Sequence, residues 1–192
     1  MSWLVVGLGN PGNEHSATRH NIGFQVADYL AAQVAGKFSK HKSKAEVLEG
    51  RFGVGVDAPK IIIAKPQTFM NLSGEAVGDF SRYYKIPTNE VIVILDDISL
   101  PLGTLRIRKS GSAGGHNGLE SVLVHLSTEA VPRLRVGIGQ PDGSALHDHV
   151  LGRFTNEELP AVEESVTRAA DAFEYANAHG IDAAMNQFNQ KN

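Results

Sequence analysis

A histidine and several amide or carboxylate side chains stand where the chain leaves an apolar run or enters a helical pattern. Asn10 follows the run Leu4–Val6, Asp96 follows Val91–Leu95, and His20 precedes helical spacing. An imidazole exchanges its proton near neutral pH, so His20 could take a proton from water, and Asp96 could fix its tautomer. The amide of Asn10 could grip a peptide backbone or polarise a carbonyl group. Together these residue types suit hydrolysis by an activated water.

Two further asparagines have a comparable placement. Asn71 follows Ile61–Ala64 within KPQTFMNLSG, and Asn117 stands at the expected N-cap of a helix in GGHNG. In open α/β sheets the carboxyl ends of the strands meet at one crevice, so such residues can converge despite their separation in sequence. Each of them, taken alone, could equally be a turn residue or a helix cap.

Residue types that the sequence lacks narrow the chemistry. There is no cysteine and no G-x-S-x-G motif, so we expect no covalent acyl-enzyme, no disulfide and no Cys-ligated zinc. A His–Asp pair that activates water suits an ester better than an amide, whose nitrogen leaves less readily. The loop-like stretch Gly139–His149 contains His147 and His149, but this spacing is too weak a pattern to predict a metal site.

The glycines of the first loop allow a different interpretation. Gly7, Gly9 and Gly12 satisfy the G-x-G-x-x-G pattern after a strand, which is typical of dinucleotide binding. Such a site needs a helix that begins directly at the loop, and an acid about 20 residues later at the end of a second strand. Here a turn follows the loop, and Asp28 falls inside a helical pattern. A nucleotide-binding oxidoreductase therefore stays open as an alternative to the hydrolase.

The elements that must position these residues follow from hydrophobic patterning. Unalternating runs rich in β-branched residues predict strands buried on both faces at Leu4–Val6, Ile61–Ala64 and Val91–Leu95. Alternating runs predict half-exposed strands, antiparallel or near an edge, at Leu105–Arg108 and Leu134–Ile138.

Apolar residues at helical spacing predict helices between and after these strands. The spacing occurs over 22–34, 77–84, 119–126 and 159–173. A capping box of Thr155 and Glu158 begins the last long helix, Gly180 ends it, and Asp182 is expected to cap a short final helix. Strands that alternate with helices predict a single α/β domain over residues 1–192, with a twisted mixed β-sheet and helices packed around it.

Bulk composition agrees with one globular domain. The 192 residues are 42% hydrophobic and 20% charged. No run approaches the roughly 20 apolar residues that span a bilayer, so we expect a soluble protein of the cytoplasm with no membrane partner.

Six segments occur in the order seen in bacterial peptidyl-tRNA hydrolases: GLGNPG, TRHNIGF, KPQTFMNLSGEAV, LDD with LPLG, SAGGHNGL and RLRVGIG. The chain resembles that family from about residue 3 to residue 154. The resemblance implies an enzyme that cleaves the ester between peptide and tRNA, acts as a monomer and needs no metal or cofactor. An inactive RNA-binding relative of the same fold is a further alternative, and the presence of both His20 and Asp96 argues against it.

The resemblance implies a role for each candidate catalytic residue. His20 is similar to the catalytic base and Asp96 to its orienting acid, with Asp96 favoured over Asp97. Asn10 matches the residue that contacts the peptide and supports the histidine.

Further positions resemble the family's substrate contacts. Asn71 is similar to the residue that holds the backbone next to the ester, with Met70 shaping the pocket, and Asn117 to the residue that positions the water. His116 is expected to bind substrate as well. His15 stands where the family commonly has tyrosine, so its role stays open, as does the identity of the oxyanion donor.

A protein of net charge −3 must bind nucleic acid through a local patch. The segment from Ser99 to Leu119 contains no acid, and the alternation of its strand places two arginines on one face. Such a patch contacts phosphates without reading sequence. The expected tRNA-binding residues are Arg106, Arg108, Lys109, Arg133 and Arg135. A second basic cluster, Lys37–Lys44, stays open as a tRNA contact.

Overall fold

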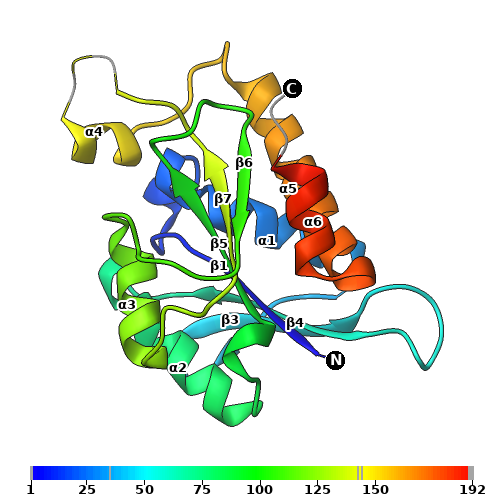
Figure 1. Ribbon diagram of the computed structural model, residues 1–192. Helices are drawn as coiled ribbons and strands as arrows, with labels where there is room; N and C mark the ends of the chain where they lie inside the picture. Colours follow the sequence, from blue (N-terminus) through cyan, green and yellow to red (C-terminus); the bar gives the residue numbers. More distant parts are fainter. Residues whose placement is uncertain (1, 35, 142, 144, 190–192) are drawn as a thin grey trace.

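The computed structural model describes residues 2–34, 36–141, 143 and 145–189. Their centre is a seven-stranded sheet of order β2-β3-β4-β1-β5-β7-β6 (Figure 1). Four strands are mutually parallel: β1 (Trp3–Gly7), β4 (Lys60–Pro66), β5 (Val91–Asp97) and β7 (Arg133–Gly137). The other three pair antiparallel with an inner neighbour: β2 (Ser39–His41), β3 (Ala45–Arg51) and β6 (Leu105–Arg108).

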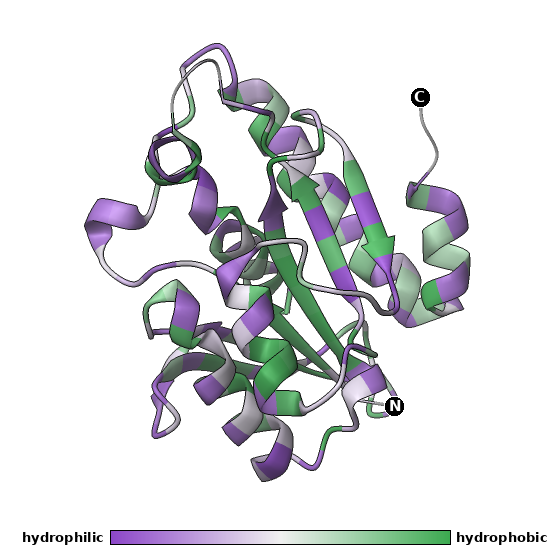
Figure 2. Cartoon of the chain, turned by 60° about the vertical axis from the view of Figure 1, so that its left-hand side comes forward, coloured by the Kyte–Doolittle hydropathy of each residue, from purple (hydrophilic) through white to green (hydrophobic). Residues whose placement is uncertain are grey.

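Both faces of the inner strands are buried. Along β1, Trp3 and Val5 belong to one apolar core, whereas Leu4 and Val6 belong to the other. Successive side chains of a strand point to opposite faces, so an unbroken apolar run supplies both cores at once. Figure 2 shows the strands as the most hydrophobic part of the chain, with hydrophilic residues on the outer sides of the helices.

Helices cover the two faces of the sheet. On one face lie α1 (Ile22–Gln33) and α5 (Leu159–His179), with α6 (Ile181–Phe188) packed on α5; on the other lie α2 (Ser73–Tyr83) and α3 (Asn117–Leu126). A short helix, α4 (Leu146–Leu151), follows β7. One-turn 3-10 helices are η1 (Asn13–His15), η2 (Arg19–Asn21), η3 (Met70–Leu72) and η4 (Thr88–Glu90).

The predicted single α/β domain with a mixed sheet is confirmed, and so are the three buried strands and the four longer helices. The two hydrogen bonds of the predicted capping box are present: the Thr155 N–H donates to Glu158 Oε2 at 2.8 Å, and the Glu158 N–H donates to Thr155 Oγ1 at 3.3 Å. The helix itself, however, begins only at Leu159, with Glu158 rather than Thr155 at its N-cap. Gly180 ends α5 with φ of 92°, a conformation that glycine adopts without strain.

Other local predictions were wrong. The strand that contains Leu134 is not half exposed, because four of the five residues of β7 are buried, although β7 does pair antiparallel with the edge strand β6. Asp182 does not cap α6, since Gly180 holds that position. The stretch Gly139–His149 is partly helical, because α4 begins at Leu146; its residues 142 and 144 lie outside the described part. Strands β2 and β3 were not predicted, because β2 has only three residues and the apolar residues of β3 (AEVLEGR) are interrupted by charged ones.

No helix in the described part of the chain combines the length and the apolar composition needed to cross a membrane.

Candidate active site

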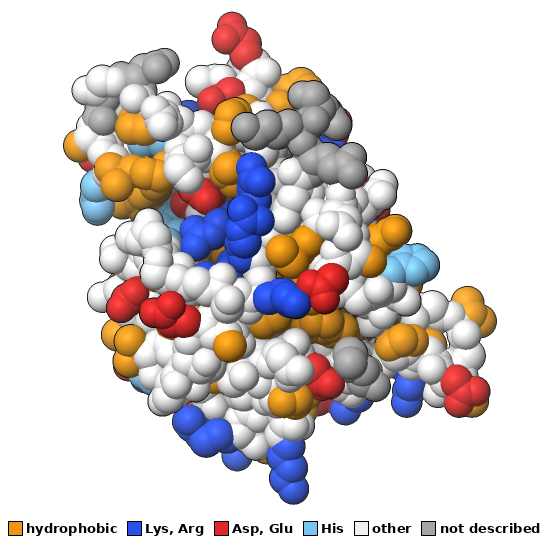
Figure 3. All heavy atoms as spheres, in the orientation of Figure 1, with side chains coloured by type: hydrophobic (Ala, Val, Ile, Leu, Met, Phe, Trp, Pro, Cys, Tyr) orange, Lys and Arg blue, Asp and Glu red, His pale blue; other side chains and the backbone are white. Residues whose placement is uncertain are grey.

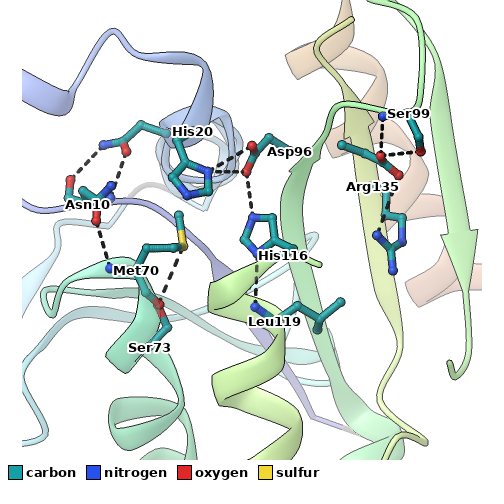
Figure 4. A network of polar contacts seen from close by, with 11 residues as sticks. Asn10, His20, Met70, Ser73, Asp96, Ser99, His116, Leu119 and Arg135 are labelled. Atoms are coloured by element: carbon teal, nitrogen blue, oxygen red, sulfur yellow. Dashed lines mark hydrogen bonds and ion pairs between the residues drawn. The ribbon is translucent and has the colours of Figure 1, made fainter. Parts of the chain in front are cut away.

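The side chains of His20 and Asp96 meet at the carboxyl end of β5. Nδ1 of His20 lies 2.9 Å from both Oδ1 and Oδ2 of Asp96 (Figure 4). Burial alone would raise the pKa of Asp96. The charges and hydrogen bonds of His116 and His20 lower it by a larger amount, so the carboxyl pKa lies well below its usual range. An ionised carboxylate only accepts hydrogen bonds, so Nδ1 of His20 carries the hydrogen and Nε2 is the proton acceptor.

A second imidazole holds the same carboxylate. Nε2 of His116 lies 2.8 Å from Oδ1 of Asp96, and Nδ1 accepts the N–H of Leu119 at 3.1 Å. Because Nδ1 accepts, Nε2 carries the hydrogen and donates it to Asp96. His116 therefore has no ring nitrogen left for substrate, contrary to the substrate-binding role expected of it.

The hydrogen bond from the N–H of Leu119 makes His116 the N-cap of α3, a position that the sequence analysis predicted for Asn117. The ligand atoms of His20, Asp96 and His116 lie within 4.8 Å of one another, a spacing at which such groups can hold a metal ion. A nitrogen that carries hydrogen cannot ligate a metal, and the tautomer of His116 places a hydrogen on the nitrogen that faces Asp96. These contacts are therefore hydrogen bonds.

Close backbone packing of glycines brings His20 to Asp96. A Cβ atom on Gly7 would overlap the carbonyl oxygen of Gly23 at the start of α1, and a Cβ on Gly23 would overlap that of Ile94 in β5. The first turn of α1 thus rests directly on the ends of β1 and β5, which sets His20, in η2 just before α1, beside Asp96.

The glycine loop does not have the form of a dinucleotide site. Helix α1 begins only at Ile22, well after Gly12, and Asp28 forms an ion pair with Lys65 at 2.7 Å. The glycines serve close packing, and the oxidoreductase alternative is not supported.

Asn10 is fixed by three hydrogen bonds, each 2.8 Å long. Its N–H donates to Oδ1 of Asn21, its carbonyl accepts from Nδ2 of Asn21, and its Oδ1 accepts the N–H of Met70. Asn10 is buried, with 8% of the residue exposed, and its side-chain amide is held in one orientation that leaves Nδ2 as a donor. Sequence reasoning missed Asn21, although it directly follows His20 in the TRHN segment.

A cavity of about 640 Å³ opens over these residues and brings most of the predicted site together. The predicted residues that line it are Asn10, His15, His20, Met70, Asn71, Asp96, His116, Asn117 and Arg135. It also has apolar walls that the sequence did not reveal, formed by Phe69 and by Leu146, Val150 and Leu151 of α4. About 80 residues of sequence separate Phe69 from α4, so only the fold could have identified these walls.

Strands β6 and β7 pair arginines across their ladder. Arg106 lies opposite Arg135, and Arg108 lies opposite Arg133, on the face turned away from Leu105. Arg106 is partly exposed and Arg108 is exposed. Figure 3 shows Lys and Arg side chains gathered over these two strands. The predicted common face of Arg106 and Arg108 is therefore confirmed.

Arg133 does not belong to that surface, contrary to expectation. It is 1% exposed, and its guanidinium donates to three carbonyl oxygens, of Val131 at 2.8 Å, Ser112 at 3.0 Å and Glu129 at 3.1 Å. Burial and the nearby charge of Arg135 lower the pKa of Arg133 to about 10, so the group stays charged at neutral pH. Its role is to fasten the loop before α3 to β7.

Two other cations of this face have acidic partners. Arg135 lies 3.7 Å from Asp97, which also accepts hydrogen bonds from the backbone and hydroxyl of Ser99. Lys109 lies 2.8 Å from Asp182 of α6. The cluster Lys37–Lys44 is remote from Arg135 and Lys109, because it includes β2, which forms the opposite edge of the sheet from β6.

Comparison with known proteins gives one consistent answer. A model of the peptidyl-tRNA hydrolase family matches residues 4–192. The peptidyl-tRNA hydrolase of Alkaliphilus metalliredigens is 49% identical over 187 residues, which cover 97% of this chain and 99% of that protein. The one from Chloroflexus aurantiacus is 47% identical over 189 residues, covering 97% and 98%. A crystal structure of peptidyl-tRNA hydrolase from Acinetobacter baumannii matches with a TM-score of 0.88 at 33% identity, covering 97% of this chain and 94% of that one.

Proposed function

The chain belongs to the peptidyl-tRNA hydrolase family, and on that premise we propose that it hydrolyses the ester bond between a peptide and its tRNA. The observation that carries this function is the placement of His20. Its Nδ1 is held 2.9 Å from both oxygens of Asp96, on the wall of a cavity of about 640 Å³. This arrangement leaves Nε2 of His20 as the base.

The reaction needs one water molecule and one base. Water attacks the carbonyl carbon of the ester while its proton passes to Nε2 of His20. The carboxylate of Asp96 stabilises the imidazolium that forms. The tetrahedral intermediate then breaks its bond to the ribose oxygen, and the imidazolium gives the proton to that oxygen. Free tRNA and peptide leave.

The carboxamides of Asn10, Asn71 and Asn117 contact the substrate. Their common position on the cavity wall supports this role. Oδ1 of Asn10 is occupied by the N–H of Met70, so its Nδ2 is the group that donates to a carbonyl or to the oxyanion. His15 and Met70 shape the cavity, and His116 positions Asp96 rather than the substrate.

The tRNA lies along the arginines of β6 and β7 that are exposed or partly exposed. Arg106, Arg108 and Arg135 contact its phosphates, with Lys109 at the end of the row. Arg106 and Arg135 lie directly opposite each other on neighbouring strands. Like charges in this position repel each other, and a bound phosphate relieves that repulsion.

The protein acts in the cytoplasm as a monomer. The family resemblance supports both statements, and size-exclusion chromatography with light scattering tests the second. A dimer mass would overturn it.

An assay of N-acetyl-aminoacyl-tRNA hydrolysis tests the function, with the released N-acetyl amino acid as the measured product. The wild-type protein should cleave this substrate, and His20→Ala should not. An inactive wild-type protein would support the alternative of a non-catalytic RNA-binding relative.

A further inference from the structure

A second hollow lies beside the edge strand β6, away from the catalytic residues. It has a volume of about 460 Å³ and lies between β6, the loop before it, α5 and the end of α6. Two arginines line it from different elements, Arg106 of β6 and Arg168 of α5. Its lining contains no carboxylate among the described residues, which are Ser99, Leu100, Pro101, Gly103, Thr104, Leu105, Arg106, Arg168, Phe188 and Asn189.

The guanidinium of Arg168 is already oriented. Its Nη1 donates to the carbonyl oxygen of Gly103 at 2.8 Å, and the side chain is partly buried. Holding one N–H in this way reduces the side-chain entropy lost when the other N–H groups bind a ligand. The hollow is therefore preorganised on the α5 side.

The opposite wall is also held in place. The side-chain amide of Asn189 donates to the carbonyl of Ile107 at 2.9 Å and accepts its N–H at 2.7 Å. It completes the hydrogen bonding of the edge strand at the residue next to Arg106, as another strand would. This contact fastens the end of α6 to β6 and fixes the width of the hollow.

The two arginines that line the hollow have no acidic partner in the part of the chain that the structure describes. Arg135 and Lys109 on the same face are paired with Asp97 and Asp182. Within the described ranges, by contrast, no ion pair joins Arg106 or Arg168 to a carboxylate. Arg106 also lies opposite another arginine, Arg135. Two arginines that line an acid-free concavity from different elements favour an anion with several oxygens.

We propose that this hollow binds a backbone phosphate of tRNA, so that the nucleic-acid surface continues from β6 around the edge of the sheet onto α5. This inference rests on the proposed function and adds Arg168 to its binding residues. A nucleic-acid phosphate fits better than a free phosphate ion because Arg106 continues directly into the exposed row on β6 and β7. A backbone with regularly spaced phosphates can occupy both places at once.

The salt dependence of tRNA binding tests the site. Dissociation constants of deacylated tRNA are measured for wild type, Arg168→Gln and Arg106→Gln over 50 to 200 mM KCl. Each phosphate contact contributes about 0.9 to the slope of log K against log salt concentration. Each variant should therefore have a slope lower by about 0.9, and its binding defect should shrink about threefold over this fourfold range of salt. Arg168→Lys, which keeps the charge, should recover most of the slope.

Arg82→Gln is the matched control. Arg82 is an exposed arginine of α2 with Asp79 as its partner, on the part of the molecule remote from β6. It should bind tRNA with the wild-type slope. An unchanged slope for Arg168→Gln, in a variant that unfolds at the wild-type temperature, would overturn the proposal. If Arg168→Gln unfolds early, its slope is measured below its unfolding temperature, where an unchanged slope again overturns the proposal.

Two further measurements separate the sources of failure. Millimolar inorganic phosphate should raise the melting temperature of wild type and of Arg168→Gln equally; a shift that needs Arg168, with an unchanged tRNA slope, would assign the hollow to free phosphate instead. The binding slopes need no chemistry, whereas wild-type hydrolysis of N-acetyl-aminoacyl-tRNA tests only the proposed function. A failure of one is thus distinguishable from a failure of the other.

Discussion

Nε2 of His116 donates to Oδ1 of Asp96 across 2.8 Å, while the same carboxylate accepts the Nδ1 hydrogen of His20. One buried carboxylate is therefore clamped between two imidazoles of different function. The tautomer of His116 is set by the N–H of Leu119, so its hydrogen always points at Asp96. His116 fixes the carboxylate, and the carboxylate fixes His20.

Removal of the base should abolish turnover. We expect His20→Ala to lower kcat by a factor on the order of 10² to 10⁴, because proton transfer from water loses its acceptor. The dissociation constant for tRNA should change little, since His20 lies outside the arginine surface. Single-turnover hydrolysis of N-acetyl-aminoacyl-tRNA measures the first effect and filter binding the second. A variant with wild-type kcat would remove His20 from the mechanism.

Asp96→Asn should be almost as damaging although it keeps the shape. The Asn amide can donate to Nδ1 of His20, which then favours the tautomer with hydrogen on Nε2, where the water should lose its proton. A loss of kcat on the order of 10² to 10⁴ is expected, by analogy with the orienting aspartate of serine proteases. NMR of the ring nitrogens of His20 reports the tautomer directly. An unchanged tautomer with reduced activity would contradict this explanation.

Two substitutions of His116 separate its cap from its contact with Asp96. His116→Ala loses both, and should destabilise the protein by about 1 kcal/mol through the cap alone. His116→Asn keeps a favourable cap residue but is too short to hold Asp96. Both variants should lower kcat with little change in KM, whereas only His116→Ala should lose the cap contribution in urea unfolding. A rise in KM with unchanged kcat would instead return His116 to the substrate-binding residues.

Acid should reveal the contribution of Asp96 to stability. Its pKa is lowered in the folded protein, so the unfolded chain binds the proton more readily. The stabilisation is fully present above the unfolded pKa of about 4 and is lost as the pH falls from there toward the folded value. The free energy of unfolding should therefore drop more steeply below pH 4 for wild type than for Asp96→Asn. Parallel curves from pH 6 to pH 2.5 would show that the carboxylate is not specially stabilised.

Substitution of Arg133 should reduce stability, whereas substitution of Arg135 should reduce tRNA binding. Arg133→Met removes one buried and two part-buried hydrogen bonds to carbonyl oxygens and should destabilise the protein by about 3 kcal/mol. Arg135→Gln should unfold near the wild-type temperature but bind tRNA more weakly, with a smaller salt slope. Calorimetry and salt-dependent binding measure the two effects. Wild-type stability of Arg133→Met would contradict its structural role.

The sequence alone determined the class of fold and the chemistry. Runs such as Leu4–Val6 and Val91–Leu95 are apolar on both faces, which suits only strands covered on both sides, and helical spacing between them completes an α/β domain. The motifs around His20 and Asp96 identified the family and the water-activating pair. These features are local in the chain, so they can be read from neighbouring residues.

The tertiary structure decided what depends on contacts between distant segments. Arg133 and Arg135 alternate along one strand and both donate to the carbonyl oxygen of Ser112, yet Arg133 is buried and Arg135 lines the cavity. His116 and Asp96 are 20 residues apart, and the hydrogen bond between them follows from how the loop before α3 meets the end of β5. Arg168 belongs to none of the sequence motifs, so the sequence alone did not predict a role for it. Its place beside Arg106 arises because α5 packs against the sheet next to the edge strand, a relationship that no local pattern encodes.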